Sequence, residues 1–93
     1  MNRSNGDSKL GKLPHVQLLG ELRPGARGVI TKVQELREAT LTLRLMEMGL
    51  LEGGAFEVVH EAPFSRDPIV VRVRGSLIAL RREEANSIEV VLS

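Results

Sequence analysis

The sequence of 93 residues has room for one small hydrophobic core but not for two domains. It contains no cysteine, which excludes disulfides, thiolate metal sites and thiol catalysis and fits a reducing, cytoplasmic compartment. Its 13 basic and 12 acidic residues nearly cancel to a net charge of +1, so there is no general attraction to nucleic acid or anionic lipid. The longest uninterrupted apolar run covers only residues 77–80, and we therefore expect no membrane insertion.

The N-terminal stretch is polar, contains glycine and has no periodicity. We predict that residues 1–16 form a flexible tail and residues 17–93 the folded domain. The residues Arg23-Pro24-Gly25 are typical of a turn, and a strand over Arg27–Val33 follows them. Three apolar residues just before this turn are candidates to close the edge of the sheet: Val16, Leu18 and Leu22.

Between residues 41 and 54 the apolar spacing changes from the strand period of two to a helical one. Thr40 is the best available N-cap, and Gly49 stands where a helix end needs a residue that accepts positive φ. Leu50 can then fold back onto Leu45, the apolar contact that accompanies a glycine-terminated helix. We therefore predict one main helix at one end of a small sheet. Two neighbouring stripes make up its apolar surface: Leu41, Leu45 and Met48, and Leu43, Met46 and Leu50.

Apolar alternation then returns and predicts four more strands: Ala55–Ala62, Ile69–Arg74, Leu77–Leu80 and Ile88–Leu92. In the first of these, His60 is expected on the same face as Phe56 and Val58. Gly75-Ser76 is interpreted as a two-residue hairpin turn, and Arg81–Asn86 as one helical turn. Strands joined by short turns, with one helix inserted after the first, predict a mainly β fold with one main α-helix. The expected architecture is a small, partly open, five-stranded barrel.

Residues that could carry catalysis or hold a metal are sparse. His15 and His60 lie far apart and have no ligand pattern around them, so we predict no metal site, with weak binding by either histidine left open. Glu83-Glu84 is interpreted as surface charge on a helical turn, and Asp67 as a carboxylate that caps its own turn. The sequence contains no phosphate-binding glycine loop, dinucleotide motif or nucleophile elbow. We predict no catalytic residues, no cofactor and no enzyme activity.

Four basic residues lie before and after the predicted hairpin, two on its first strand and two at the start of the helical turn that follows its second strand, so they could form one patch: Arg72, Arg74, Arg81 and Arg82. One interpretation is a solvated strand face that also discourages edge pairing, and the other is a docking surface for an acidic partner. Nucleic acid is a weaker candidate because barrels bind single strands through stacked aromatic residues, and only Phe56 and Phe64 are aromatic. A groove for proline-rich peptides needs the same aromatic walls. We expect no nucleic-acid partner.

Four blocks of the sequence stand out: LRPGARGVI, RLMEMGLLEGG, APFSRDPIVVRVRG and LIALRREEANSIEV. In this order they resemble the FeoA family, small SH3-like barrel proteins of bacterial ferrous-iron uptake. The resemblance covers about residues 18–91, and it implies an SH3-like form of the predicted barrel. Two positions depart from the family pattern: Glu52-Gly53, where a proline-glycine turn is common, and Ser65-Arg66, where glycine is frequent.

The resemblance implies a cytoplasmic accessory protein rather than a transporter. It makes FeoB, the membrane ferrous-iron transporter with a cytosolic GTP-binding domain, the expected partner. The same fold occurs as the C-terminal domain of iron-dependent repressors, but no DNA-binding domain precedes it here, so we do not expect a whole repressor. Two alternatives stay open: a repressor-tail type of domain that binds another protein or DNA, and a weak transition-metal-binding protein. The resemblance implies no metal ligands and no catalytic residues.

The expected docking surface combines the helix, its exit loop and the loop after the second strand. Its predicted contact residues are the apolar Met46, Leu50, Leu51 and Phe64, together with Arg72 and Arg74. Core packing accounts for each apolar residue about as well, and for Leu50 it is the better account. Self-association through the same loop or through exposed strand edges stays open, as does the choice between activation, inhibition and assembly of the transporter.

Overall fold

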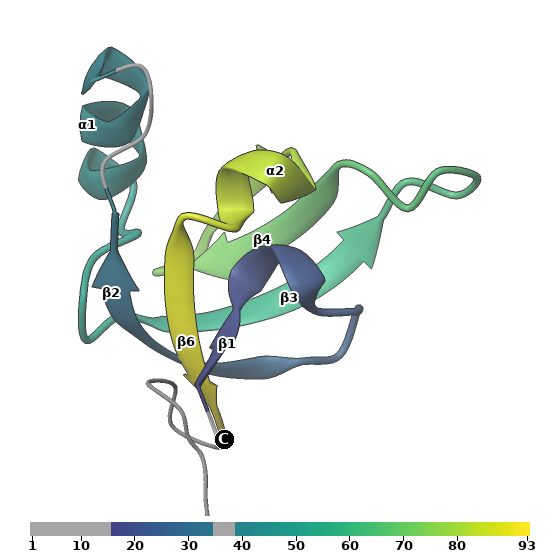
Figure 1. The fold of residues 1–93 in the computed structure, drawn as a ribbon, viewed down its shortest axis with the longest axis horizontal. Helices are drawn as coiled ribbons and strands as arrows, with labels where there is room; N and C mark the ends of the chain where they lie inside the picture. The colour runs from purple at the N-terminus through teal and green to yellow at the C-terminus, as the bar shows by residue number, and fades with distance from the viewer. Residues whose placement is uncertain (1–15, 35–38) are drawn as a thin grey trace, which may run out of the picture.

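The computed structural model describes residues 16–34 and 39–93, with the side chains of the first helix described from Leu43 onward (Figure 1). The strands are β1 (Val16–Leu18), β2 (Arg27–Val33), β3 (Ala55–Glu61), β4 (Ile69–Val73), β5 (Ser76–Leu80) and β6 (Ile88–Leu92). The helices are α1 (Ala39–Glu47), α2 (Arg82–Ala85) and the short 3-10 turn η1 (Leu19–Glu21). No helix in the described ranges is long and apolar enough to cross a membrane. Nearly all of the predicted tail, residues 1–15, lies outside the described residues.

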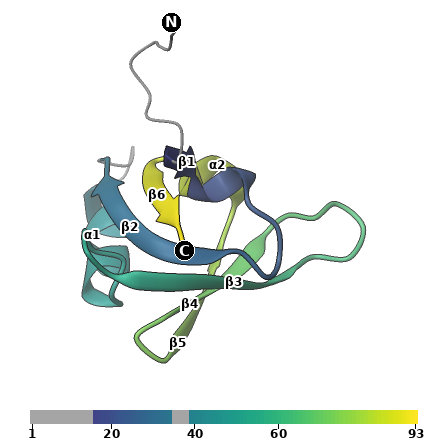
Figure 2. The same cartoon turned by 90° about the horizontal axis from the view of Figure 1, so that it is seen from below.

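All six strands form one antiparallel sheet in the order β1-β6-β2-β3-β4-β5, which curves without closing on itself (Figure 2). The predicted mainly β, partly open barrel with one main helix is confirmed, although the sheet has six strands instead of five. The additional strand is β1, in which Val16 pairs with Val91 and Leu18 with Glu89. Two of the residues expected to close the edge of the sheet therefore do so.

The period of two explains which side the sheet buries. In β4 the side chains of Ile69, Val71 and Val73 are fully buried and that of Arg72 is exposed, as predicted. The hydrophobic core draws on every strand from β2 to β6, on α1 through Leu45, and on α2 through Ala85. Its remaining members are Leu19, Leu22, Ile30, Leu50, Phe56, Val58, Ile78, Leu80, Ile88 and Val90.

β3 departs from strict alternation near its end. Val58 pairs with Val71 but His60 pairs with Val70, so a bulge accommodates the one residue between them. The bulge leaves His60 exposed, whereas Phe56 and Val58 are buried. The prediction that His60 shares a face with these two residues was wrong, because the period of two holds only along an uninterrupted ladder.

The hairpin between β4 and β5 turns one residue earlier than predicted. Val73 pairs with Ser76, so the turn residues are Arg74 and Gly75 rather than Gly75 and Ser76. Both have positive φ, 52° and 80°, as a type I′ turn requires, and this turn matches the twist of the two strands. Arg74 is therefore a turn residue in a conformation unusual for a residue other than glycine, and not an outward-facing strand residue.

α1 lies beyond the end of β2, to one side of the sheet (Figure 1), and it ends as predicted. The N–H of Leu50 bonds to the C=O of Leu45 at 3.0 Å, and the N–H of Gly49 to the C=O of Met46 at 3.0 Å. These two bonds define a Schellman motif, in which Gly49 adopts a φ of 108°. At the other end the prediction was wrong, because α1 begins at Ala39 and Thr40 lies inside the helix.

Candidate functional site

A hollow of about 400 Å³ lies between the end of β2, α1 and the loop that leaves α1. It is lined by Val33, Met46, Leu51 and Glu52, and we call it the α1 hollow. Met46 is exposed and Leu51 is half-buried, because the Schellman turn directs the intervening Leu50 into the core. The structure therefore brings together two of the predicted contact residues, Met46 and Leu51.

Leu50 does not belong to any surface. Its side chain is 0% exposed and packs in the hydrophobic core together with Leu45. The prediction of Leu50 as a docking residue is therefore corrected. Core packing, the alternative that the sequence had favoured for this residue, is the account that the structure supports.

Phe64 is 100% exposed in the loop between β3 and β4. This loop projects from one end of the molecule, whereas α1 stands at the other end in both ribbon views (Figures 1 and 2). A single docking surface that combines Phe64 with Met46 and Leu51 was therefore a wrong expectation. The chain separates them because β3 and β4 run the full width of the sheet between the two loops.

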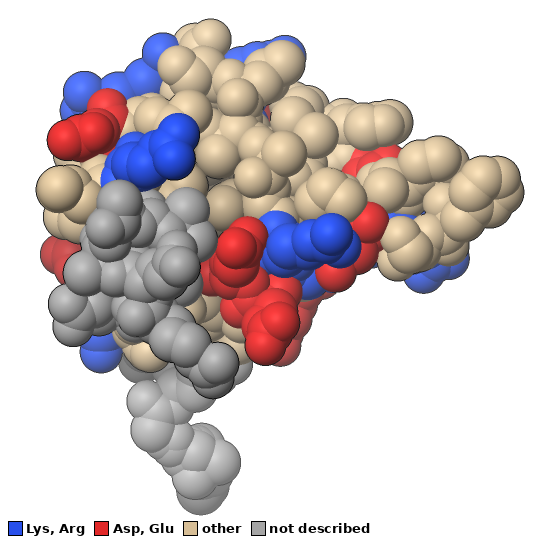
Figure 3. Space-filling view, turned by 90° about the horizontal axis from the view of Figure 1, so that it is seen from above, with Lys and Arg blue, Asp and Glu red and all other residues tan. Residues whose placement is uncertain are grey.

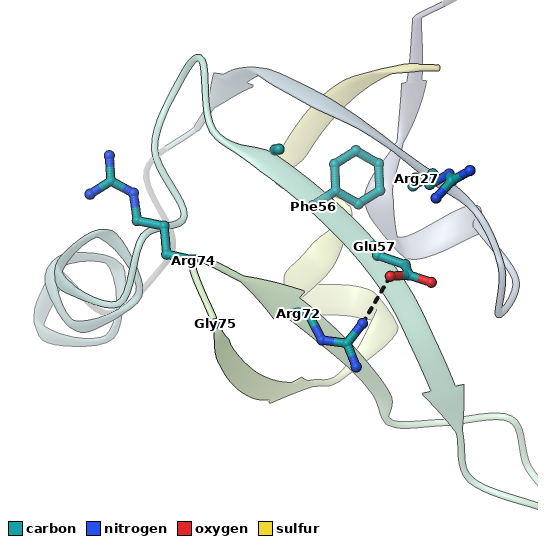
Figure 4. Close-up of a pocket in the computed structure, with 7 residues that line it drawn as sticks. Arg27, Phe56, Glu57, Arg72, Arg74 and Gly75 are labelled. Atoms are coloured by element: carbon teal, nitrogen blue, oxygen red, sulfur yellow. Dashed lines mark hydrogen bonds and ion pairs between the residues drawn. The ribbon is translucent and has the colours of Figure 1, made fainter.

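A second hollow, of about 260 Å³, lies on the outer side of β3 and β4 (Figure 4). Arg27, Glu57 and Arg72 stand opposite one another on β2, β3 and β4, so charges alternate across these strands. Arg72 donates a hydrogen bond from Nη1 to Oε1 of Glu57 at 2.9 Å. Its charge is therefore partly compensated by a neighbour in the sheet, in a solvent-exposed pair of small energetic weight.

Arg74 has different surroundings although it is only two residues away. Figure 4 shows its guanidinium pointing away from Arg72 and towards α1. Its aliphatic stem lies against Gly49, where an added Cβ would stand 3.0 Å from Cδ of Arg74. Arg72 and Arg74, both predicted as contact residues, therefore line different edges of this second hollow.

Arg82 is directed into the protein rather than out of it. It donates from Nη1 to the carbonyls of Gly20 at 2.9 Å and Leu22 at 2.7 Å, and from Nε to the carbonyl of Arg66 at 2.7 Å. Its Nη2 bonds to Oε1 of Glu61 at 2.8 Å. A single basic cluster containing Arg82 was therefore a wrong expectation, because the guanidinium fork is used to join three separate segments.

Glu61 completes this network. Arg23 also donates to it, from Nε at 3.2 Å and from Nη2 at 3.0 Å. These hydrogen bonds, together with the nearby charges of Arg23, Arg82 and Arg66, lower the pKa of the Glu61 carboxyl and outweigh the effect of burial, which raises it. We call Arg23, Glu61 and Arg82 the arginine latch, because they fasten the loop before β2 to the end of β3 and the start of α2.

The start of α2 is capped by two carboxylates. Asp67 accepts the backbone N–H of Arg82 at 2.9 Å, and Glu84 accepts that of Arg81 at 3.0 Å. Asp67 was expected to cap its own turn, and it instead caps a helix 15 positions further along the chain. The sequence carried no signal for this contact or for the arginine latch, because the partners are far apart in the chain and follow no local motif.

Charged side chains are scattered in small groups on the face seen from above, outside the atoms drawn in grey (Figure 3). Among the described residues, no three histidine or carboxylate side chains come together in a way that could hold a metal ion. His60 is exposed on β3, and His15 lies outside the described residues.

The fold and these surfaces define a small, mainly β barrel domain with two helices. Residues 17–92 match the model of the FeoA domain. The chain is 37% identical to FeoA from Chlorobium tepidum, with a TM-score of 0.72 over 83% of this chain and 71% of that one. FeoA from Stenotrophomonas maltophilia, an SH3 domain protein solved with zinc, is 29% identical, with a TM-score of 0.68 over 83% and 89%. The chain belongs to the FeoA family, whose small SH3-like domain is not a known enzyme.

A fusion protein of Porphyromonas gingivalis joins Fe(2+) transport protein A to the Fe(2+) transporter FeoB. The chain is 39% identical to it over 74 residues, which are 80% of this chain but only 8% of the fusion protein. In that relative a FeoA part is joined to a ferrous-iron transporter. IdeR from T. acidophilum, at 18% identity and a TM-score of 0.70 over 91% of this chain and 37% of that one, shares the fold alone.

Proposed function

We propose that this chain is a cytoplasmic accessory module of ferrous-iron uptake that docks on a FeoB-type transporter. The observation that carries the proposal is the relative in which a FeoA part and FeoB are joined in one chain. Fusion places the two parts at a high effective concentration, which suits partners that otherwise meet by binding. This chain spans only 8% of that relative, so we assign the movement of ferrous iron across the membrane to the transporter and not to this chain.

The α1 hollow is the docking surface that we assign to this interaction. Three apolar side chains line it, Val33, Leu51 and Met46, of which Met46 is 37% exposed, and Glu52 is the one charged lining residue. One further residue points to the same face: Leu43, which is 57% exposed, precedes Met46 by three residues on α1 and so lies on the same side of the helix. Methionine and leucine side chains adapt readily to a partner surface, and their burial supplies apolar area without a charged contact.

Docking can regulate the transporter only if this chain binds two states of the transporter with different affinities. A tenfold preference for one nucleotide state corresponds to about 1.4 kcal/mol, which is within the usual range of coupling energies. The proposal is therefore that the α1 hollow contacts a region of the cytosolic GTP-binding part that changes with the bound nucleotide.

The test is an NMR titration of the labelled chain with the soluble GTP-binding part of a FeoB-type transporter, with and without nucleotide. We expect saturable shifts around Met46 to Leu51 that depend on the nucleotide. Leu51→Asp should weaken binding about tenfold or more, since it places a charge in an apolar contact. Phe64→Ser, an exposed apolar residue at the opposite end, is the matched control and should leave binding unchanged.

Unchanged binding in a folded Leu51→Asp variant would move the docking surface away from the α1 hollow. Loss of binding in Phe64→Ser would place it on the loop between β3 and β4. No shifts at concentrations well above about 100 μM would contradict docking on the GTP-binding part altogether.

A further inference from the structure

β5 is a free edge of the sheet. In the described strand order it pairs with β4 on one side and with no strand on the other. Figure 2 shows the hairpin of β4 and β5 projecting to the lower margin of the molecule, away from β1 and β6. The opposite edge, β1, has three residues, whereas β5 has five. β5 is therefore the longer of the two edges on which another strand could pair.

The hairpin register decides which backbone groups β5 offers. Val73 and Ser76 close a two-residue turn and so form a hydrogen-bonded pair, and the pattern alternates from there. Arg72 with Leu77 and Val70 with Ala79 are consequently the pairs without hydrogen bonds between them. The N–H and C=O groups of Leu77 and Ala79 therefore point away from β4, towards the open side.

The usual protection of a free edge is missing from β5. Natural edge strands carry charges, proline or bulges that prevent another strand from adding. β5 has the sequence SLIAL, without charge or proline, and its pairing with β4 runs without a register shift. On its outer face Leu77 is 59% exposed and Ala79 is exposed. The backbone groups of this edge are therefore free to pair with another strand, and no side chain of β5 carries a charge that would oppose it.

Two cations flank β5 in the chain. The side chain of Arg74 is turned towards α1, so Arg81 is the cation that borders the open edge itself. Arg74 precedes β5 and Arg81 follows it, and both are exposed. Neither has an ion-pair partner among the residues that the structure describes, unlike Arg72 and Arg82. The sequence from residue 69 to residue 82 contains no acidic side chain. Arg74 also occupies a φ of 52°, where asparagine or glycine is easier, so the cation is present at a conformational cost.

We propose that the β5 edge binds an extended, acidic segment of a partner protein as an added strand. The main chain of the segment pairs with the free groups of Leu77 and Ala79, and an acidic side chain at the end of the segment nearest α2 meets Arg81. The proposal concerns other residues than the α1 hollow, goes beyond the proposed function and does not depend on it.

Charge selects this occupant over a second copy of the chain. An antiparallel pair of β5 strands centred on Ile78 places Arg81 of one copy opposite Gly75 and beside Arg74 of the other, so like charges meet at both ends. Nucleic acid is also a poor occupant, because Leu77 and Ala79 each offer a donor and an acceptor, and a phosphate backbone supplies acceptors only.

The test uses the synthetic peptide Asp-Glu-Thr-Val-Thr-Val-Glu-Asp, with Lys-Lys-Thr-Val-Thr-Val-Lys-Lys as its charge-reversed counterpart. Each is titrated to about 5 mM into the labelled chain, a range that detects weak binding. We expect saturable amide shifts at Leu77 and Ala79 with the acidic peptide and none with the basic one. Ala79→Pro removes one outward donor without touching the β4 ladder and should abolish the shift at the Leu77 amide, since proline itself has no amide proton to observe.

A charge swap keeps the test decisive if Ala79→Pro fails to fold. Arg81→Glu should weaken the acidic peptide about threefold to fivefold and admit the basic peptide. Arg27→Glu, on the outer face of β2 and away from the edge, is the matched control and should change neither. Absence of shifts at β5, or equal shifts with both peptides, would overturn the proposal. Concentration-dependent shifts at β5 without peptide would replace the proposed occupant with a second copy of the chain.

Discussion

Gly49 and Arg74 lie in contact although 25 positions separate them in the sequence. A Cβ added to Gly49 would stand 3.0 Å from Cδ and 3.2 Å from Cγ of Arg74. Gly49 ends α1 and Arg74 turns β4 into β5, so this contact joins the helix to the hairpin that carries the free edge. The glycine is required twice, by its φ of 108° and by the arginine stem beside it.

Gly49→Ala should lower the free energy of unfolding by about 1–3 kcal/mol, because alanine is strained at this φ and also meets the arginine stem. Gly53→Ala is the matched control, since Gly53 has a φ of 87° but no neighbour within 4 Å of an added Cβ. Urea unfolding of both variants measures the difference. Equal losses of unfolding free energy in the two variants would show that the clash with the Arg74 stem adds nothing to the strain at positive φ. If Gly49→Ala loses more than Gly53→Ala, the double variant Gly49→Ala with Arg74→Ala should regain part of that difference.

Leu50 and Leu51 are neighbours with opposite roles. Leu50→Ala should cost about 2–5 kcal/mol, because the side chain is fully buried and leaves a cavity in the core. Leu51→Ala should cost less than about 1 kcal/mol, because that side chain is half-buried at the rim of the α1 hollow. Thermal unfolding followed by circular dichroism separates the two. Similar losses in both variants would mean that Leu51 belongs to the core and is a poor contact residue.

Arg82→Lys should destabilise the protein by about 2–4 kcal/mol despite the retained charge. A lysine ammonium cannot reach the carbonyls of Gly20, Leu22 and Arg66 together with Glu61, so some of these groups lose their partner. Arg81→Lys, at the exposed neighbouring residue, is the control and should stay within about 0.5 kcal/mol of the parent. Chemical denaturation gives both values, and a neutral Arg82→Lys would show that the arginine latch does not hold the loops.

The lowered pKa of Glu61 predicts how stability depends on pH. The unfolded state takes up this proton first, near its ordinary pKa of 4.5, so the contribution of Glu61 is complete above that value and is lost as pH falls through the lower folded pKa. The stability difference between the parent and Glu61→Gln should therefore shrink as pH falls from 7 to 3. Glu83→Gln, on the exposed side of α2, serves as the control. A difference that stays constant over this range would contradict the assignment.

The alternation of apolar residues was sufficient to predict β4, the buried face of the sheet and most strand boundaries. The glycine after the apolar stripe was likewise sufficient to predict the end of α1. Both features depend on residues within one turn or one strand, where side-chain period and allowed φ act directly on neighbouring positions. The resemblance carried by four sequence blocks then led to the FeoA family, which the match over residues 17–92 confirms.

Register and long-range contacts were decided only by the tertiary structure. The bulge in β3 turned His60 outward, and the hairpin register moved the turn to Arg74, because each depends on the facing strand. Arg82 and Asp67 could not be placed from sequence, since their partners lie 15 to 62 positions away and meet only when the loops pack. Two further features belong to the assembled sheet: Phe64 lies far from the α1 hollow, and β5 has an unpaired edge. Local patterns specify the strands, and only the order of the strands in space decides which surfaces remain exposed.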